Sequence, residues 1–173
     1  MNTRQELLWA PWRLAYVTQP KPPAGSNPCF ICRGLAEHDD RGNMLVTRTE
    51  RSVVYLNRYP YNNGHLLVAP RAHVPTLLEL PDTEAGPLFI AVRRLAAAVE
   101  RGLGADGTFV AMNNKVSQSV PHLHVHIVPR RRKDGLRGFF WPRTTYGSEA
   151  DATAVAERIR AALMVEYAPG PDA

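Results

Sequence analysis

The hydrophobic and polar positions of this chain separate short β-like stretches from two longer helical ones. β-Branched and aliphatic residues dominate residues 44–47, 52–56 and 65–69, which are therefore predicted to be strands. A short polar turn joins the first two, and Asn62-Asn63-Gly64 is a good turn sequence before the third. Two further strands are predicted over residues 108–113 and 122–128.

Two stretches carry apolar residues at helical spacing. The first predicts a helix over residues 83–103, which Asp82 or Thr83 can cap, Gly104 can end and Pro87 is expected to distort. Its inward positions are Leu88, Val92, Leu95, Ala96, Val99 and Leu103. The second predicts a helix over residues 149–167, with Ala152, Val155, Ile159, Leu163 and Tyr167 facing inward. The predicted order of elements, three strands, then a helix, then two strands, favours an α+β protein. Its five strands would form an antiparallel sheet with a helix on one face.

The last predicted strand has a histidine at every second position. Because strand side chains alternate between faces, His122, His124 and His126 are predicted to share one face and the aliphatic residues between them the other. The outer two would then lie about 13 Å apart, too far to bind one ion through bonds of about 2 Å. The pattern favours a row of separate donors, acceptors and nucleophiles for a phosphate-bearing substrate. A metal site and purely structural histidines are the alternatives.

This segment, His122-Leu123-His124-Val125-His126-Ile127-Val128, resembles the signature of the histidine triad family of nucleotide hydrolases and transferases. Other motifs of that family occur in order around it: Asn57-Arg58, Gly64-His65-Leu66-Leu67-Val68-Ala69-Pro70 followed by His73, Gln118-Ser119-Val120, and Pro129-Arg130. The resemblance covers roughly residues 28 to 130. A uridylyltransferase-like branch of the family has glutamine at the position of His126, so the histidine here favours the hydrolase and phosphoramidase branches.

The resemblance implies roles for these residues. His124 would be the nucleophile that takes the nucleoside monophosphate, which suits a neutral imidazole near pH 7. His126 would donate to a non-bridging phosphate oxygen, His65 would support it, and His122 would complete the catalytic set. The implied substrate-binding residues are Asn57, Asn113, Gln118 and Ser119.

The expected reaction is attack of His124 on the α-phosphorus of an adenine nucleotide, with diadenosine polyphosphates as the first substrate class. Nucleoside phosphoramidates and phosphorolysis remain alternatives within the same chemistry. A nucleotide-binding regulatory module without turnover and a zinc-dependent hydrolase built on the same histidines are alternatives from other classes.

The two cysteines, Cys29 and Cys32, have the spacing of a zinc knuckle. A zinc ion would need two further ligands, for which His38, His73 and His122 are candidates. In some bacterial family members the matching cysteines join the histidines that correspond to His73 and His122, so the resemblance implies a structural Zn²⁺ there and no organic cofactor. Ordinary packing and a redox pair are the alternatives, although no thioredoxin-like context surrounds the cysteines.

Length and charge narrow the setting. The chain has 173 residues, which suits one domain, and a formal net charge of +5, which suits a nucleotide polyphosphate. No DNA- or RNA-binding motif is present, so no specific nucleic acid is predicted. No apolar run approaches the roughly 20 residues of a membrane span and no signal pattern opens the chain, so we expect a cytoplasmic protein without a membrane partner.

The flanks of the predicted domain, residues 29–130, differ from it in composition. Residues 1–28 form a proline-punctuated extension whose large aromatic residues are expected to pack on the domain, a partner subunit or, alternatively, a membrane surface: Trp9, Trp12 and Tyr16. Residues 131–173 continue a basic run that either is solvated or holds distal phosphates. Phe140 or Trp141 either stacks on a base or closes a dimer interface. The resemblance implies a homodimer joined through the first helix and the adjacent strand.

Overall fold

The computed structural model of the chain describes residues 29–36, 44–135 and 145–166. Several predictions concern residues outside these ranges: Trp9, Trp12, Tyr16, His38, Phe140, Trp141 and Tyr167. The chain divides into two units, Met1–Leu136 and Arg137–Ala173, each of which is described by itself. Among the described residues, no helix combines the length and apolar character that crossing a membrane requires.

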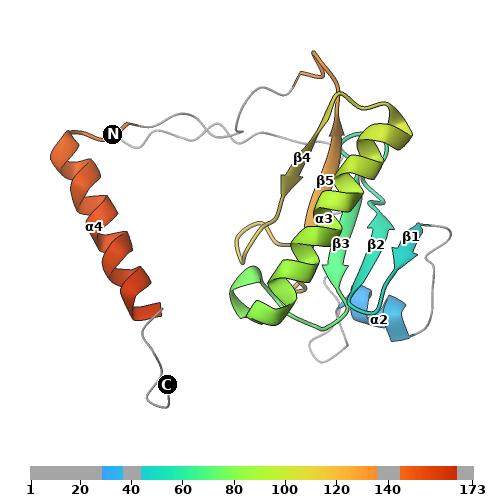
Figure 1. Cartoon of the computed structure of the whole chain (residues 1–173), viewed down its shortest axis with the longest axis horizontal. Helices are drawn as coiled ribbons and strands as arrows, with labels where there is room; N and C mark the ends of the chain where they lie inside the picture. The colour runs from blue at the N-terminus through green and yellow to red at the C-terminus, as the bar shows by residue number, and fades with distance from the viewer. Residues whose placement is uncertain (1–28, 37–43, 136–144, 167–173) are drawn as a thin grey trace. The chain divides into compact units, whose positions relative to one another are not determined.

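The first unit contains a five-stranded sheet in the order β1-β2-β3-β5-β4 (Figure 1). Its strands are β1 (Leu45–Arg48), β2 (Ser52–Leu56), β3 (Leu66–Pro70), β4 (Gly107–Ala111) and β5 (Val125–Arg130). Every neighbouring pair is antiparallel. The predicted α+β class with an antiparallel five-stranded sheet is therefore confirmed.

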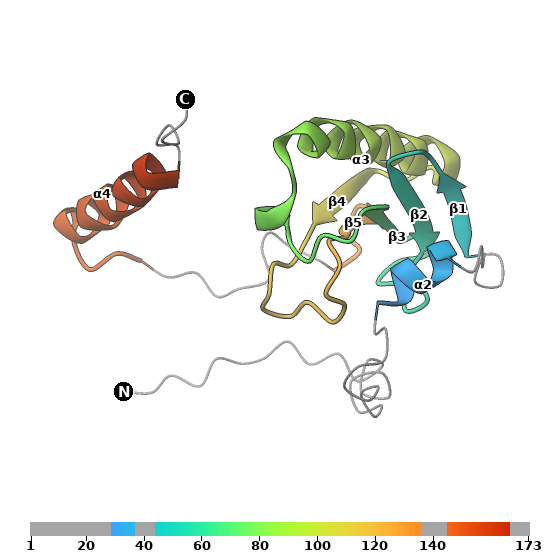
Figure 2. The same ribbon diagram turned by 90° about the horizontal axis from the view of Figure 1, so that it is seen from below.

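Helices lie on both faces of this sheet (Figure 2). Helix α3 (Asp82–Leu103) covers one face, and the short helix α2 (Phe30–Ala36) lies on the other. Alternation along β2 sends Val54 into the core under α3, whereas Val53 and Tyr55 pack with α2. Sequence patterning predicted α3 but not α2, because a seven-residue helix is held by tertiary packing rather than by its own periodicity.

The ends of α3 differ in how well the sequence predicted them. Gly104 ends the helix in the left-handed conformation, with φ of 58°, as expected. The predicted side-chain cap is wrong, because the helix already begins at Asp82 and its N-cap is Pro81, which makes no side-chain cap bond. Leu88, Val92 and Val99 are buried as predicted. Leu103 is 45% exposed, so its predicted inward position is wrong.

The start of β5 corrects the histidine row. The strand begins at Val125, so the predicted start at residue 122 is wrong: His126 lies within the strand, while His122 and His124 precede it. The physical reason is that Pro70 has no N–H for strand pairing and its carbonyl accepts from the His122 ring instead, at 2.8 Å. The aliphatic half of the pattern holds, since Leu123, Val125 and Ile127 are all fully buried under α3.

The second unit contains helix α4 (Glu149–Glu166), close to the predicted 149–167. The hydroxyl of Ser148 accepts from the Asp151 N–H at 3.1 Å and so caps the helix start. Within this unit Ile159 is 63% exposed, and its predicted inward orientation stays a prediction.

Candidate functional site

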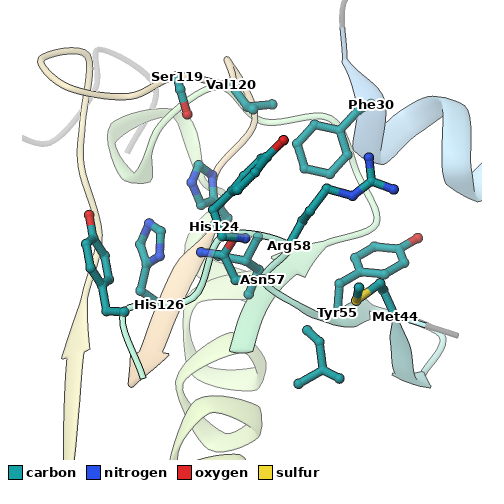
Figure 3. Close-up of a pocket in the computed structure, with 13 residues that line it drawn as sticks. Phe30, Met44, Tyr55, Asn57, Arg58, Ser119, Val120, His124 and His126 are labelled. Atoms are coloured by element: carbon teal, nitrogen blue, oxygen red, sulfur yellow. The ribbon is translucent and has the colours of Figure 1, made fainter. Parts of the chain in front are cut away.

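A pocket of about 260 Å³ opens on the sheet face that α3 does not cover (Figure 3). Residues from the start of α2, the end of β2 with its following turn, and the segment leading into β5 form its walls. These residues are Phe30, Met44, Tyr55, Leu56, Asn57, Arg58, Tyr59, Tyr61, Leu67, Ser119, Val120, His124 and His126.

His124 presents an unprotonated ring nitrogen. Its Nδ1 lies 2.7 Å from the main-chain carbonyl oxygen of His122. A carbonyl only accepts hydrogen bonds, so Nδ1 carries the proton and Nε2 holds the lone pair. Burial lowers the pKa of His124, and the bond to the His122 carbonyl opposes that shift. His124 is therefore a neutral imidazole near pH 7 and can act as a nucleophile through Nε2.

A chain of hydrogen bonds fixes the tautomers of His65 and His126. The Tyr61 N–H donates to Nδ1 of His65 at 3.3 Å, and the Asn57 amide nitrogen lies 3.2 Å from the same atom and 3.5 Å from Nε2. Since Tyr59 N–H donates to Oδ1 of Asn57, the Asn57 NH₂ group is turned toward His65. His65 thus carries its proton on Nε2 and donates to Nδ1 of His126 at 2.9 Å. The proton of His126 is then on Nε2.

The two pocket histidines stand side by side. Their ring centroids lie 5.0 Å apart, and His65, which is fully buried, lies 5.1 Å behind His126. Tyr61 stacks on the opposite side of His65 at 5.3 Å. One wall of the pocket therefore places a lone pair beside an N–H donor. This pairing suits attack on an electrophile whose oxygens need a hydrogen bond, such as a phosphoryl group.

His122 belongs to a different cluster, together with Cys29, Cys32 and His73. One potential ligand atom from each residue lies within 4.8 Å of all the others. The Nδ1 atom of His122 lies 3.2 Å from Sγ of Cys29 and 3.6 Å from Sγ of Cys32, and Nδ1 of His73 lies 3.2 Å from Sγ of Cys32. A tetrahedral zinc ion would set such sulfur–nitrogen separations at about 3.5 Å.

The surroundings of this cluster suit a bound cation. Nε2–H of His122 donates to the carbonyl of Pro70, which leaves Nδ1 unprotonated toward the sulfurs. The Cys32 N–H donates to Sγ of Cys29 at 3.4 Å. Burial, together with the neighbouring Cys29, raises the pKa of the Cys32 thiol to about 11. Two adjacent thiolates are therefore unfavourable without a cation, and a cation reverses that preference.

Three other predicted site residues differ in whether they line the pocket. Ser119 lines the pocket, whereas Gln118 and Asn113 do not. The Gln118 amide donates to the Pro75 carbonyl at 2.6 Å and accepts from the Lys115 N–H at 2.9 Å, so it braces the loop that carries Ser119. Asn113 donates to the Ser117 carbonyl at 3.4 Å.

The basic run after β5 is partly occupied by structural bonds. The Arg130 guanidinium forms an ion pair with Asp134, with N–O distances of 2.5 and 2.7 Å. The Arg131 guanidinium donates to the carbonyls of Leu103 and Gly104 at the end of α3. These two arginines therefore stabilise the fold rather than extend the pocket.

Several lining residues were not predicted as site residues, notably Phe30, Met44, Tyr55, Tyr59 and Tyr61. Two of them carried a readable signal. Tyr59 and Tyr61 are 42% and 52% exposed and flank Pro60 in the turn before His65. Large aromatic side chains in an exposed turn favour a binding surface. Phe30 joins the pocket through the position of α2, Met44 from just before β1 and Tyr55 from within β2.

Comparisons with known proteins agree with this geometry. The family model of the HIT domain matches residues 41–133. A bis(5'-nucleosyl)-tetraphosphatase of Schizosaccharomyces pombe is 36% identical over 54% of this chain, and the match spans 52% of that protein, about half its length. An AP-4-A phosphorylase of Mycobacterium tuberculosis is 30% identical over 71% of this chain and 67% of its own.

Solved structures match a larger share of this chain at somewhat lower identity. A Streptococcus mutans protein has a TM-score of 0.69 and 28% identity, covering 84% of this chain and 91% of its own. A HIT family protein of Bacillus subtilis has a TM-score of 0.67 and 29% identity, covering 76% of this chain and 94% of its own.

Proposed function

The chain belongs to the HIT domain family, and from that membership we propose that it is a nucleotide hydrolase or transferase acting on dinucleoside polyphosphates at the α-phosphorus. The observation that carries the proposal is the pairing of the His124 lone pair with the adjacent His126 donor in one pocket wall. Relatives named as a bis(5'-nucleosyl)-tetraphosphatase, a bis(5'-adenosyl)-triphosphatase and an AP-4-A phosphorylase support the substrate class.

In the first step, Nε2 of His124 attacks the α-phosphorus. A nitrogen–phosphorus bond forms, the bridging phosphorus–oxygen bond breaks, and the remaining nucleotide leaves with the bond's electron pair. His126 donates to a non-bridging oxygen, and His65 holds it in the donor tautomer. The His122 carbonyl accepts a hydrogen bond from Nδ1–H of His124 and so stabilises the positive charge that develops on the ring.

In the second step, water attacks the same phosphorus. Its oxygen remains on the nucleoside monophosphate, the bond to Nε2 breaks with its electron pair returning to the ring, and the protons of the water are released to solvent. His124 returns to its neutral form. Ser119 and Asn57, which line the pocket, are the proposed contacts to the phosphate and the nucleoside. Gln118 is proposed to act by bracing the loop of Ser119, and Asn113 remains a more distant candidate.

We also propose that Cys29, Cys32, His73 and His122 bind Zn²⁺ as a structural ion. Two sulfurs and two imidazole nitrogens, with three sulfur–nitrogen separations of 3.2, 3.2 and 3.6 Å, are a donor set that zinc favours. The bound ion would stabilise the fold and keep both thiols deprotonated, while His124 and His126 lie outside its coordination. We further propose a triad domain over residues 29–130 with flanking segments 1–28 and 131–173, a homodimer, and a cytoplasmic location.

Intact-protein mass spectrometry after brief exposure to diadenosine tetraphosphate tests the central proposal. We expect an adenylyl adduct on the wild-type chain and none on the His124→Ala variant, with the adduct mapping to His124. An active protein that forms no adduct, or an adduct that persists in the variant, would contradict the proposed nucleophile.

Phosphorolysis is a second candidate reaction, favoured by the AP-4-A phosphorylase match, which covers 71% of this chain. In that case phosphate replaces water in the second step, and the products are a nucleoside diphosphate and the leaving nucleotide. Turnover of dinucleoside polyphosphates and adenosine phosphoramidate, each with and without added phosphate, separates hydrolysis, phosphorolysis and phosphoramidase activity.

A further inference from the structure

We propose that the metal cluster positions the nucleotide pocket, so that its occupancy sets nucleotide affinity and the rate of nucleotidyl transfer as well as stability. The inference rests on the proposed function, because it concerns the pocket and the nucleophile assigned there. Two contacts link the cluster formed by Cys29, Cys32, His73 and His122 to opposite parts of that pocket.

The first link runs through Phe30. This residue lies between the two cysteines, is the first residue of α2 and lines the pocket, where Figure 3 shows it near Arg58 and Val120. The first turn of α2 is built on Cys29, whose carbonyl accepts from the Arg33 N–H at 3.0 Å and whose sulfur accepts from the Cys32 N–H. Fixing the two sulfurs on one ion therefore fixes the wall that Phe30 provides.

The second link runs through the main chain of His122. Its ring is fully buried and is held at both nitrogens, by the cysteine sulfurs on Nδ1 and by the Pro70 carbonyl on Nε2. The carbonyl of the same residue receives the Nδ1–H of His124 at 2.7 Å. Anchoring the His122 ring thereby orients the group that gives the nucleophile its tautomer and direction. Cys29, Cys32 and His73 are positioning residues in this scheme, because they act on the reaction through Phe30 and His122.

The domain has a core that does not depend on the cluster. The apolar residues under α3 come from that helix, β2, β3 and β5, with Val74, Leu80 and Leu123 from the connecting segments, and none of the four cluster residues is among them. The cluster packs on the other sheet face, where Cys29 joins Ile31, Val53, Tyr55 and Val120. Loss of the ion is therefore expected to loosen the pocket side of the sheet while the α3 side stays folded.

Energetic coupling between two sites is reciprocal. If a bound ion tightens nucleotide binding tenfold, a bound nucleotide tightens ion binding by the same factor. Removing partners that hold a ligand in position commonly changes binding or activity about 10- to 100-fold. We therefore expect about a tenfold loss of AMP affinity and about a tenfold loss of kcat when the ion is removed.

The test uses the full chain loaded with Zn²⁺ and the same chain after treatment with a chelator, below the unfolding temperature of both. Isothermal titration gives the Kd for AMP, and competition with a chelating dye gives the Kd for Zn²⁺ with and without AMP. We expect both constants to show the same coupling factor while the far-ultraviolet circular dichroism stays constant. An AMP affinity that is unchanged in folded, zinc-free protein would overturn the inference and leave a purely stabilising site.

The His73→Ala variant keeps the test decisive if the zinc-free wild type unfolds. His73 is exposed and does not line the pocket, so its loss weakens the ion site without altering a pocket side chain. AMP affinity should fall in this variant at low Zn²⁺ and recover as Zn²⁺ is raised. Arg71→Ala is the matched control, since this exposed residue lies two positions away and its guanidinium donates to the Thr49 carbonyl, outside the cluster and the pocket. If the affinity of the His73→Ala variant for AMP does not change with the concentration of Zn²⁺, the inference is also overturned.

The Phe30→Ala variant separates the two links. It should weaken AMP binding with Zn²⁺ still bound, and stripping the ion should then cost less additional affinity than in the wild type, because one path is already lost. Full additivity of the two losses would refute the path through Phe30.

Failure of the proposed function has a different signature. In that case the zinc-loaded wild type neither binds AMP nor forms an adduct on His124, and zinc occupancy has nothing to modulate. Failure of the coupling alone leaves AMP binding and the adduct intact in both zinc-loaded and zinc-free protein.

Discussion

Two histidine clusters lie next to each other in this protein and contain the same side chain, yet their surroundings give them different chemistry. His73 and His122 direct their Nδ1 atoms at two cysteine sulfurs. His65 and His126 meet each other, an asparagine amide and a main-chain N–H. The cluster of His73 and His122 brings several lone pairs together and suits a cation. The cluster of His65 and His126 presents N–H donors and suits an anion.

The contrast teaches that the partners of a histidine decide its chemistry, not its place in a sequence repeat. His122 and His124 are two residues apart and joined by a hydrogen bond, but they fall on opposite sides of this division. Substitutions that affect one cluster and spare the other are the sharpest way to test it.

The largest expected effect is on turnover by His124→Ala. Loss of the attacking nitrogen should lower kcat by about 10⁴-fold or more, as removal of a nucleophile does in other covalent mechanisms. Zinc content by metal analysis and the unfolding midpoint should stay close to those of the wild type. Loss of zinc from this variant would contradict the proposal that one cluster serves catalysis and the other metal binding.

Cys29→Ala should have the next largest effect, this time on stability. A ligand held at about 1,000 times its Kd contributes about 4 kcal/mol, so we expect a loss of that order in the free energy of unfolding. The measurement is urea denaturation with and without a chelator. The wild type should fall to the level of the variant when chelator is added, and the variant should not respond. A variant that remained chelator-sensitive would argue that the ion sits elsewhere.

Replacing His65 tests the proton chain of the pocket cluster. His65→Ala removes the donor that fixes His126 and should lower kcat about 10- to 100-fold. His65→Gln should recover part of this loss, because its carboxamide N–H can still donate to Nδ1 of His126. Both variants should keep full zinc content. Equal activity of the two variants would mean that the hydrogen bond to His126 does not matter.

The smallest effect is expected from Asn57→Ala. Its amide shares Nδ1 of His65 with the Tyr61 N–H, so one donor remains after the substitution. A net hydrogen bond is worth about 1 kcal/mol, which corresponds to about a fivefold loss of kcat at saturating substrate. Asn57→Asp should be worse than Asn57→Ala, since a carboxylate cannot donate to that nitrogen. The reverse order would contradict the assigned tautomers.

The sheet was predictable because its information is local. Alternation and β-branched residues identified all five strands to within a few residues, and one apolar repeat identified α3. The start of β5 was not predictable in this way. It depends on the Pro70 carbonyl accepting from a ring 52 residues away, a contact that no alternation pattern contains.

The candidate site divides in the same manner. The spacing of Cys29 and Cys32 indicated a metal site, but choosing His73 and His122 as partners needed the family resemblance. Periodicity grouped His122 with His124, and the structure gives them different surroundings, because the His122 ring contacts the cysteine sulfurs and His124 lines the pocket. The pocket wall from Phe30 was missed, since α2 is a short helix that only tertiary packing sustains.

Leu123, which lies between the two clusters, takes part in neither chemistry. It is fully buried under α3, and its N–H donates to the Val74 carbonyl at 2.6 Å. The Leu123→Ala substitution would leave a cavity and lower the free energy of unfolding by about 2–5 kcal/mol. The backbone of the neighbouring residues His122 and His124 would become less tightly held. Leu123→Ala should therefore be active at low temperature and lose activity on mild heating, whereas His124→Ala should be inactive at every temperature.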